Sequence, residues 1–400
     1  MKILQHDFGG YPYPAELSRE LAARGHHVTH AWCSSLATTP GGDFALRPSD
    51  PPSLEFRPIS LGAPLEKYHY VRRWRQERRY GRLAVDLTTR ERPDVVLSAN
   101  MPLDAQVPLL HCCNRLGIPF VFWLQDLLGI AAERLLRQRL PVVGSLVGRY
   151  YLAREARVLR ASDAVIPITD DFRPLLRKWA VPDDRVTTIE NWAPVADLPV
   201  RPKDNDWARE AGLHDSFVFL YAGTMGMKHD PELIVRLAEG LGDRPDVKVV
   251  VLTQGPGGEY LESRRRDRQL HNLIVRGYEP FARMPEVMGT SDVLVAVLEP
   301  GAGVFSVPSK VLAYLCGMRP LLLAIPDENL AGRIVRRERA GLVVSPDDAA
   351  EFVAAATRLL DEPDLRADLA ANARRYAEQT FDISSIADRF ERVLERVVAR

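Results

Sequence analysis

The sequence has few cysteines, no long apolar run and no excess of charge of either sign. Its four cysteines are Cys33, Cys112, Cys113 and Cys316, and none belongs to a Cys-x-x-Cys pair, which argues against a metal site or a disulfide framework. There is no uncharged stretch of about 18 apolar residues, so we expect no membrane-spanning helix. Residues 1–10 have the pattern of a first strand rather than of a signal peptide. Together these features favour a cytoplasmic protein.

The 53 basic and 53 acidic residues balance to zero, which argues against a general nucleic-acid binder. The two halves differ, however, because residues 1–195 carry a basic excess and the rest carries an equal acidic excess. The basic half favours an anionic acceptor or an anionic membrane surface as a partner. No internal repeat of fixed period is present.

Short apolar segments alternate with amphipathic helical segments along both halves of the chain. In the first half we expect strands over 2–6, 27–33, 94–99, 119–124 and 164–168. In the second half we expect strands over 217–221, 247–253, 272–276, 292–297 and 320–324, and helices over 231–241, 284–289, 309–316 and 329–339. Such alternation is typical of parallel sheets covered on both faces. Residues His26 and His27, at a strand start, are expected to be exposed.

The chain length suits two domains, and a Pro-rich polar segment around 194–206 separates the two series of strands. The predicted fold is therefore α/β, with two Rossmann-like doubly wound domains that face each other across a cleft. We place an N-terminal, acceptor-side domain at 1–195, a linker at 196–210 and a C-terminal, nucleotide-sugar-binding domain at 211–378. A C-terminal helix at 379–400 is expected to pack back on the N-terminal domain.

Three strand-to-helix loops are candidates for ligand binding, because ligands of such folds bind at strand carboxyl ends. The first contains Gly9, Gly10 and Tyr11, where backbone N–H groups beside a helix start can approach an anion or a sugar. The alternative interpretation of this loop is a plain tight turn.

The second candidate loop runs from Tyr221 to Lys228, and it lacks the spacing of a P-loop. The third follows a hydrophobic strand with Glu299, Gly301, Ala302 and Gly303, and ends where Ser309 and Lys310 open a helix. A helix start with a lysine suits phosphate, and a carboxylate suits sugar hydroxyls. Alternatively, Ser309 is only an N-cap and Lys310 only a solvated charge.

Nearly the whole chain resembles glycosyltransferase family 4, whose members are retaining enzymes of GT-B fold. The resemblance lies in segments 21–28, 161–169, 189–192, 276–278 and 290–295, and its most specific part is Pro-Ser-Lys-Val-Leu-Ala-Tyr-Leu at 308–315. This last segment is similar to transferases that build bacterial surface polysaccharides such as O-antigen and colanic acid. The resemblance implies that Gly223, Gly277 and Tyr278 contact the nucleotide, and that Glu299, Gly301, Ala302 and Gly303 contact the donor sugar.

The resemblance also implies that Gly10, Lys228, Ser309 and Lys310 contact the donor phosphates. Gly9, Tyr11, Gln125 and Asp126 are the acceptor-side and catalytic candidates. The chain departs from many members of the family at four positions: a glutamate pair is replaced by Phe305 and Ala313, an arginine by Thr224, and a histidine by Gln125.

The implied reaction moves a sugar from a UDP- or GDP-sugar donor to a glycan or a polyprenyl-diphosphate-linked acceptor in cell-surface polysaccharide synthesis. We expect no cofactor and no metal, since fixed cations and backbone dipoles can stabilise the departing diphosphate. Two alternatives remain open, a nucleotide-sugar epimerase of the same fold and a non-catalytic sugar-binding protein. The first alternative needs no acceptor, and the second releases no nucleotide.

Two segments of the first half combine arginines with aromatic or aliphatic residues, namely 66–82 and 134–151. This composition is typical of an interfacial membrane surface. We therefore expect peripheral association with the inner face of the plasma membrane. The alternative is that both segments are solvated helix faces.

Overall fold

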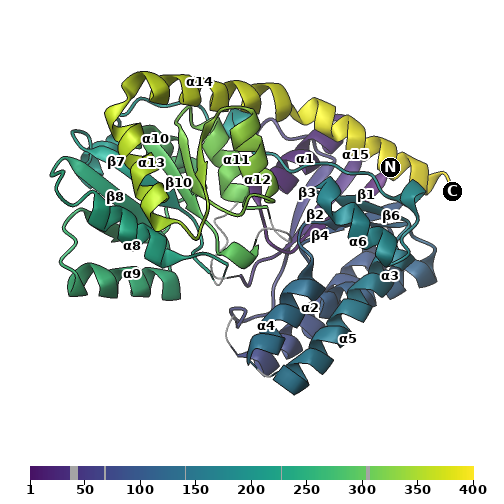
Figure 1. The fold of residues 1–400 in the computed structure, drawn as a ribbon. Coiled ribbons are helices and arrows are strands. Elements are labelled where there is room, and N and C mark those ends of the chain that lie inside the picture. The colour runs from purple at the N-terminus through teal and green to yellow at the C-terminus, as the bar shows by residue number, and fades with distance from the viewer. Residues whose placement is uncertain (37–43, 67–68, 140, 227, 303–306) are drawn as a thin grey trace. The chain divides into compact units, whose positions relative to one another are not determined.

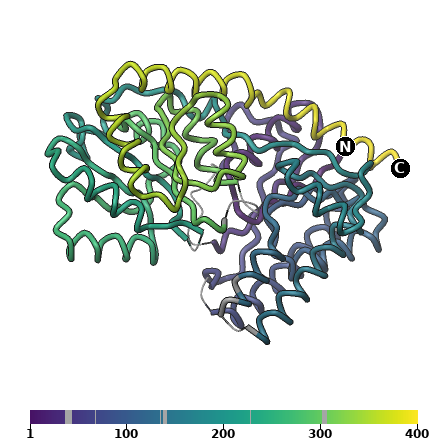
Figure 2. Tube along the Cα trace, viewed as in Figure 1, coloured from purple at the N-terminus to yellow at the C-terminus, as the bar shows by residue number. Residues whose placement is uncertain are grey.

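The computed structural model describes the chain from residue 1 to residue 400, apart from 37–43, 67–68, 140, 227 and 303–306. Residue contacts divide it into two compact units (Figures 1 and 2). The first unit consists of Met1–Asn191 together with Ile383–Arg400, and the second of Trp192–Asp382. The expected linker at 196–210 therefore lies within the second unit, and the boundaries predicted from the sequence stay predictions.

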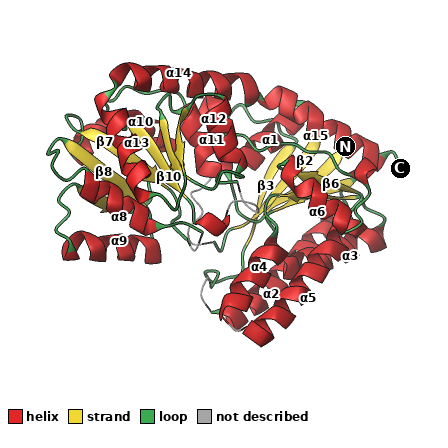
Figure 3. Ribbon diagram, viewed as in Figure 1, coloured by secondary structure: helices red, strands yellow, loops and turns green. Residues whose placement is uncertain are grey.

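The first unit is built on a parallel six-stranded sheet in the order β3-β2-β1-β4-β5-β6. Its central strands are almost entirely buried because helices cover both faces (Figure 3), which explains the apolar runs of the strands over 95–99 and 120–124. The strands are β1 (Lys2–Asp7), β2 (His27–Cys33), β3 (Leu54–Ile59), β4 (Val95–Ala99), β5 (Phe120–Leu124) and β6 (Ala164–Pro167).

The helices of the first unit include a group that packs pairwise, α2 against α3, α3 against α5 and α5 against α4. Gly81 of α2 lies so close to Ala105 of α3 that a Cβ would be 2.8 Å from the Ala105 Cα atom, which fixes how α2 packs. The helices are α1 (Pro12–Ala23), α2 (Tyr70–Glu91), α3 (Leu103–Leu116), α4 (Leu128–Arg139), α5 (Pro141–Ala161), α6 (Arg173–Lys178) and α15 (Ile383–Val398).

The C-terminal helix α15 packs on α1, although the two are far apart in the sequence. The guanidinium of Arg24 forms ion pairs with Asp388 at 2.5 Å and Glu391 at 2.9 Å. The Nε2 atom of His26 lies 2.6 Å from a carboxylate oxygen of Glu391, and Phe390 packs edge-on against Trp123 of β5. The prediction that His26 is exposed was wrong, because this helix covers it.

The second unit repeats this architecture with a parallel sheet in the order β12-β11-β10-β7-β8-β9. If β7 is counted as strand 1 and the sheet is read from β9 to β12, the order is 3-2-1-4-5-6, as in the first unit. The strands are β7 (Phe217–Ala222), β8 (Val247–Leu252), β9 (Leu273–Arg276), β10 (Val293–Val297), β11 (Leu321–Ala324) and β12 (Gly341–Val344).

Helices also cover the sheet of the second unit, and a single apolar cluster joins α8 and α13 to the central strands. The helices are α7 (Asp206–Ala211), α8 (Pro231–Gly240), α9 (Pro256–Asp267), α10 (Met284–Thr290), α11 (Ser309–Cys316), α12 (Leu330–Arg337), α13 (Ala349–Asp361) and α14 (Pro363–Thr380). The strand order reverses between β1 and β4 in one unit and between β7 and β10 in the other. Ligands of doubly wound folds bind outside the carboxyl ends of the strands at such switch points.

Candidate functional site

The switch point of the second unit gathers several residues that the sequence had singled out. Gly223 directly follows β7 with a φ of 132°, a backbone conformation that favours glycine. A Cβ at this position would lie 3.4 Å from the Cε atom of Lys310. The loop after β7 and the start of α11 are therefore in direct contact.

Lys310 is held by neutral partners. Its ammonium group donates hydrogen bonds to the hydroxyl of Tyr221 and to the carbonyl oxygen of Thr224. Burial lowers its pKa well below the ordinary value, and the nearby charge of Lys228 lowers it further. An anion bound here would oppose this lowering of the pKa, because a nearby negative charge favours the protonated form of the amine. The site is thus suited to phosphate.

Lys228 is exposed in the same loop, and its carbonyl oxygen accepts a 3.0 Å hydrogen bond from the backbone N–H of Glu299, just after β10. Glu299 is also exposed, and Gly301 lies in the 3₁₀ turn Pro300–Ala302 that follows. Gly303 lies outside the described residues, as does the position of Phe305. The loops that follow β7 and β10 are therefore joined at the switch point.

Ser309 is the first residue of α11 and is exposed, while the N-cap position belongs to Pro308, which offers no side-chain cap. The alternative interpretation of Ser309 as an N-cap was therefore wrong. The first-turn N–H groups of α11 have no side-chain cap and lie next to Lys310. Such a helix start favours negative charge.

Tyr278 and Gly277 extend this region from the end of β9. The hydroxyl of Tyr278 donates to the side-chain oxygen of Thr224 at 3.1 Å. Gly277 is exposed and approaches Gln254, where a Cβ would lie 3.2 Å from the amide nitrogen. Thr224, which replaces an arginine found in many relatives, thus contacts both Lys310 and Tyr278.

His229 is a residue of this region that the sequence analysis did not select. It is buried, and its pKa is lowered to about 2 by burial and then by the charges of Lys310 and Lys228. The backbone N–H of Gly226 donates to its Nδ1 atom at 3.1 Å. The imidazole is therefore neutral and orders the loop rather than adding a third cation.

In the first unit, the loop after β1 is organised by Asp7. Its carboxylate accepts hydrogen bonds from the backbone N–H groups of Gly9 at 3.2 Å and Tyr11 at 2.7 Å. It also accepts one from the side-chain amide of Asn100 at 2.9 Å. Burial raises the pKa of this carboxyl to about 6, although these hydrogen bonds oppose the shift. The loop is therefore a turn that the Asp7 carboxylate holds in order, and its role in ligand binding stays a prediction.

Asn100 follows β4 and is the second residue that the sequence analysis missed. Its φ of 57° lies in the left-handed region, which costs energy for a residue with a side chain and is concentrated at functional sites. Gly10 has a φ of 64°, and its N–H donates to the carbonyl oxygen of Asp7 at 3.4 Å. The role of Gly10 at the donor phosphate stays a prediction.

All four acceptor-side candidates line one cavity of about 210 Å³ at the first switch point. They are Gly9, Tyr11, Gln125 and Asp126. The remaining lining residues are mostly apolar, namely Phe8, Leu36, Asn100, Met101, Phe122 and Leu128. The structure thus brings together residues that are more than 110 positions apart in the sequence.

Gln125, which replaces a histidine found in many relatives, is fixed by two neighbours. The hydroxyl of Tyr13 donates to its side-chain oxygen at 3.1 Å, and its amide group exchanges hydrogen bonds with the amide of Asn191. Asn191 is the third site residue that the sequence analysis did not assign. With both ends of its amide engaged, Gln125 forms a rigid wall of the cavity.

Glu155 of α5 holds the helix that follows Asp126. It is fully buried, and its Oε2 atom accepts the N–H of Gly129 at 3.0 Å in the first turn of α4. There is no room between them, because a Cβ on Gly129 would lie 2.7 Å from that oxygen. Burial, opposed by the backbone hydrogen bonds of Gly129 and Leu128 and aided by the charge of Asp126, raises the pKa of Glu155 to about 8.

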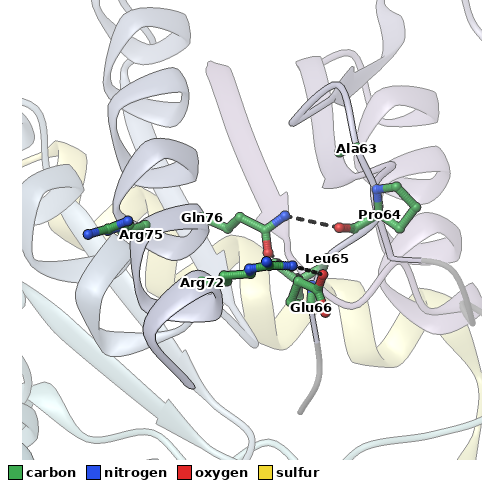
Figure 4. A pocket seen from close by; sticks show the side chains of 7 residues that line it. All are labelled: Ala63, Pro64, Leu65, Glu66, Arg72, Arg75 and Gln76. Atoms are coloured by element: carbon green, nitrogen blue, oxygen red, sulfur yellow. Dashed lines mark hydrogen bonds and ion pairs between the residues drawn. The ribbon is translucent and has the colours of Figure 1, made fainter. Parts of the chain in front are cut away.

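A second hollow, of about 440 Å³, lies at the start of α2 (Figure 4). Gln76 closes one side, because its amide donates to the carbonyl oxygen of Pro64 at 3.0 Å. The guanidinium of Arg72 lies 3.7 Å from the carboxylate of Glu66, and Arg75 points away from that pair in Figure 4. This hollow is basic at its rim and apolar where Ala63 and Leu65 line it.

Among the described residues, no three His, Cys, Asp or Glu side chains are arranged to hold a metal ion. The four cysteines are free and buried. None of the helices in the described part of the chain has the length and apolar character needed to cross a membrane.

The two units, each a doubly wound parallel sheet with a polar site at its switch point, define a protein of the two-Rossmann class. Residues 8–192 match the model of the glycosyl transferase 4-like domain, and residues 203–376 match that of the glycosyl transferases group 1. The two halves of the chain belong to these families of glycosyltransferase domains, and the chain has the GT-B fold. This finding favours transfer over the alternatives of an epimerase and a non-catalytic binding protein.

Several characterised or named relatives are similar in sequence. An alpha-D-kanosaminyltransferase of Streptomyces kanamyceticus is 24% identical over 61% of this chain and 63% of its own length. WcaI of Escherichia coli, named as a colanic acid biosynthesis glycosyl transferase, is 26% identical over 62% of this chain and 60% of its own length. The chain thus spans less than two thirds of these two relatives. A D-inositol 3-phosphate glycosyltransferase of Frankia alni is 28% identical over 92% of this chain and 89% of its own length.

Solved structures share the fold. Sucrose-phosphate synthase from Thermosynechococcus elongatus superposes with a TM-score of 0.74 at 16% identity, over 99% of both chains. HepE of Anabaena in complex with UDP-glucose has a TM-score of 0.70 at 16% identity, over 99% of this chain and 100% of its own.

Proposed function

We propose that the protein is a retaining glycosyltransferase that moves a sugar from a UDP- or GDP-sugar to a hydroxyl of a glycan or polyprenyl-diphosphate-linked acceptor. The acceptor would belong to cell-surface polysaccharide synthesis, as the name of the relative WcaI suggests. The observation that carries the proposal is Lys310, a half-buried lysine with neutral partners, beside Lys228 and an uncapped helix start. A nucleoside diphosphate supplies the anion that this site lacks.

In the proposed step, the bond from the anomeric carbon to the diphosphate oxygen breaks and a bond to the acceptor oxygen forms. The acceptor hydroxyl gives its proton to the departing diphosphate, on which negative charge accumulates as the bond to the sugar breaks. Lys310, Lys228 and the first N–H groups of α11 would stabilise that charge without a metal. Retention of the anomeric configuration is inferred from the resemblance to family 4. Donor binding by a distant structural neighbour, HepE with UDP-glucose, is consistent with this donor class.

The acceptor side of the proposal rests on the first unit. Exposed apolar side chains occupy the start of α2 and the start of α5, including Trp74 at 40% and Val142 at 76% exposure. Others at these two helix starts are Tyr70, Val71, Val143, Leu146, Val147 and Tyr150. Exposed arginines accompany them, among them Arg72, Arg75, Arg78, Arg79 and Arg149. Apolar groups beside arginines suit an anionic lipid surface, and we infer peripheral membrane association on this basis.

The experiment that tests the proposal incubates the purified protein with a panel of UDP- and GDP-sugars, with and without a bacterial lipid extract. We expect nucleotide release that depends on one donor and on the extract, together with transfer of the sugar to a lipid-linked product. Interconversion of the donor sugar without any acceptor would instead indicate an epimerase. Lack of nucleotide release with every donor and extract would contradict the proposal.

A further inference from the structure

The cavity of the first unit carries information about the acceptor that the family resemblance does not supply. Its lining includes the apolar residues Phe8, Met101, Phe122 and Leu128 together with the aromatic residue Tyr11. Its volume of about 210 Å³ is below the roughly 300–1,000 Å³ of pockets for drug-sized ligands. A group of about the size of one monosaccharide ring fits such a space, and the aromatic walls suit the apolar face of a ring.

The charge of the cavity is one-sided. Asp126 contributes a carboxylate to the lining, and the described residues around the cavity include neither lysine nor arginine. The carboxyl of Asp7 lies directly behind the loop that carries Gly9 and Tyr11. Both acids are close enough to Tyr11 to raise the pKa of its phenol above the ordinary value, after the larger effect of burial.

The other polar groups of the cavity do not offset this negative charge. The amide of Asn100 is directed to Asp7 at 2.9 Å, and the amide of Gln125 is engaged with Tyr13 and Asn191. These amides are therefore unable to turn and solvate an anion without breaking buried hydrogen bonds. Arg72 and Arg75 line a different hollow of the first unit, the one at the start of α2.

From this arrangement we propose that the cavity receives a single acceptor ring that is neutral or carries an amino group, and that it excludes a ring bearing a phosphate. The proposal rests on the function proposed above, since it takes this cavity as the acceptor side of the transferase. Asp126 accepts a hydrogen bond from a hydroxyl or an ammonium of that ring. A diphosphate linked to such an acceptor lies outside the cavity.

The test uses three ligands that differ at a single position: glucose, 6-amino-6-deoxyglucose and glucose 6-phosphate, together with the matching galactose series. Binding to the purified protein is measured by saturation-transfer NMR. Excess inorganic pyrophosphate is present throughout, so that the Lys228 and Lys310 site of the second unit does not capture the phosphorylated sugar. We expect the amino and neutral rings to bind, and the phosphorylated ring to bind at least about tenfold more weakly, because of like-charge repulsion at short range.

A charge exchange provides the second arm. In Asp126→Asn, the ratio of the affinity for the amino ring to the affinity for the neutral ring should fall to about one. In Asp126→Lys, the phosphorylated ring should bind more tightly than the other two rings. The matched control is Glu55→Gln, which removes an exposed carboxylate from β3 and should leave all preferences unchanged.

Preferred binding of the phosphorylated ring by the wild-type protein would overturn the inference, and so would failure of all the rings to bind. Preferences that stay the same in Asp126→Lys would overturn it as well. A separate measurement, the rise in melting temperature with UDP, GDP or their sugars, reports on the donor site of the second unit. If that rise is present while the rings fail, the acceptor inference is wrong and the proposed transferase function remains.

Discussion

The ammonium group of Lys310 lies 3.7 Å from the centre of the Tyr221 ring and donates a hydrogen bond to its hydroxyl. The two residues come from α11 and β7, on either side of the switch point of the second unit. An aromatic face and a hydroxyl stabilise a cation only in part. The charge of Lys310 is thus held in place without being neutralised by a carboxylate among the residues that the structure describes.

Removal of this charge should impair transfer more than folding. We expect Lys310→Ala and Lys228→Ala each to reduce kcat/KM at least about tenfold, the scale of one lost charge-assisted contact. Lys248→Ala is the matched control, because Lys248 lies on β8 with its ammonium on the carbonyl oxygen of Pro245. Near-normal turnover in either variant, with an unchanged melting temperature, would remove that lysine from the donor site.

Chelation should have little effect on activity. The cations of the proposed donor site are side chains, and the described residues offer no three-ligand cluster for a metal. We therefore expect most of the transferase activity to persist in excess EDTA. Complete loss that only Mg²⁺ or Mn²⁺ restores would show that a divalent ion carries part of the diphosphate charge.

The loop after β1 should depend on the ionisation of Asp7. Its carboxylate form accepts the N–H groups of Gly9 and Tyr11, and its pKa is raised to about 6. As the pH falls through about 6, protonation removes an acceptor, so transfer should decline with a midpoint near that value. Asp7→Asn should be slow at every pH and lack this decline. An unchanged acid limb in the variant would assign that limb to another group.

Glu155 should make the protein less stable as the pH rises. Its pKa is about 8 in the folded chain and 4.5 ordinarily. Between these values the folded state therefore binds more protons than the unfolded state, and the free energy of unfolding decreases with increasing pH. Urea titrations at about pH 5 and about pH 8 should show this loss for the wild type and a smaller one for Glu155→Gln. Equal losses of stability in the wild type and in Glu155→Gln would contradict the prediction. The control variant Glu55→Gln, which changes an exposed carboxylate, should lose as much stability as the wild type.

Binding to anionic liposomes tests the membrane surface. We expect the protein to sediment with vesicles that contain phosphatidylglycerol, less so at high salt, and little with neutral vesicles. Replacement of Arg72, Arg75 and Arg79 by Gln should weaken binding about tenfold or more, since each contributes on the order of 1 kcal/mol.

A control for that experiment replaces three arginines of the second unit, Arg264, Arg266 and Arg337, by Gln. These changes lower the net charge by the same amount but leave α2 unaltered. Equal weakening in both triple variants would attribute binding to overall charge. Failure of the wild type to bind at low salt would favour a soluble acceptor.

Strands with continuous apolar runs were predictable, whereas two of the four edge strands were missed. The ten predicted strands all exist, with ends that differ by at most two residues, because central strands of a parallel sheet are buried on both faces. The two missed strands, β3 and β12, each lie at one edge of their sheet, whereas the strands at the opposite edges, β6 and β9, were predicted. Strand β3 has the sequence Leu-Glu-Phe-Arg-Pro-Ile and exposes several side chains, so it lacks the apolar signal.

Site residues were predictable where they lie in a loop that follows a strand. They were not predictable where their function depends on a contact with a residue far away in the sequence. Gly223 and Lys310 were accessible from the sequence because each adjoins a strand or helix boundary. Asn100 became visible only through its left-handed φ and its contact with Asp7. His26 has the local sequence of an exposed strand start, yet it is buried under α15, more than 350 residues later.

The return of α15 to the first unit has a consequence for synthesis of the chain. The ribosome makes the whole second unit, Trp192–Asp382, before the helix that completes the first. Until then, the surfaces of Trp123, Arg24 and His26 that α15 covers are open to solvent or to chaperones. The second unit is thus a topological insertion, and an isolated first unit should need α15 supplied as a separate peptide to reach its native packing.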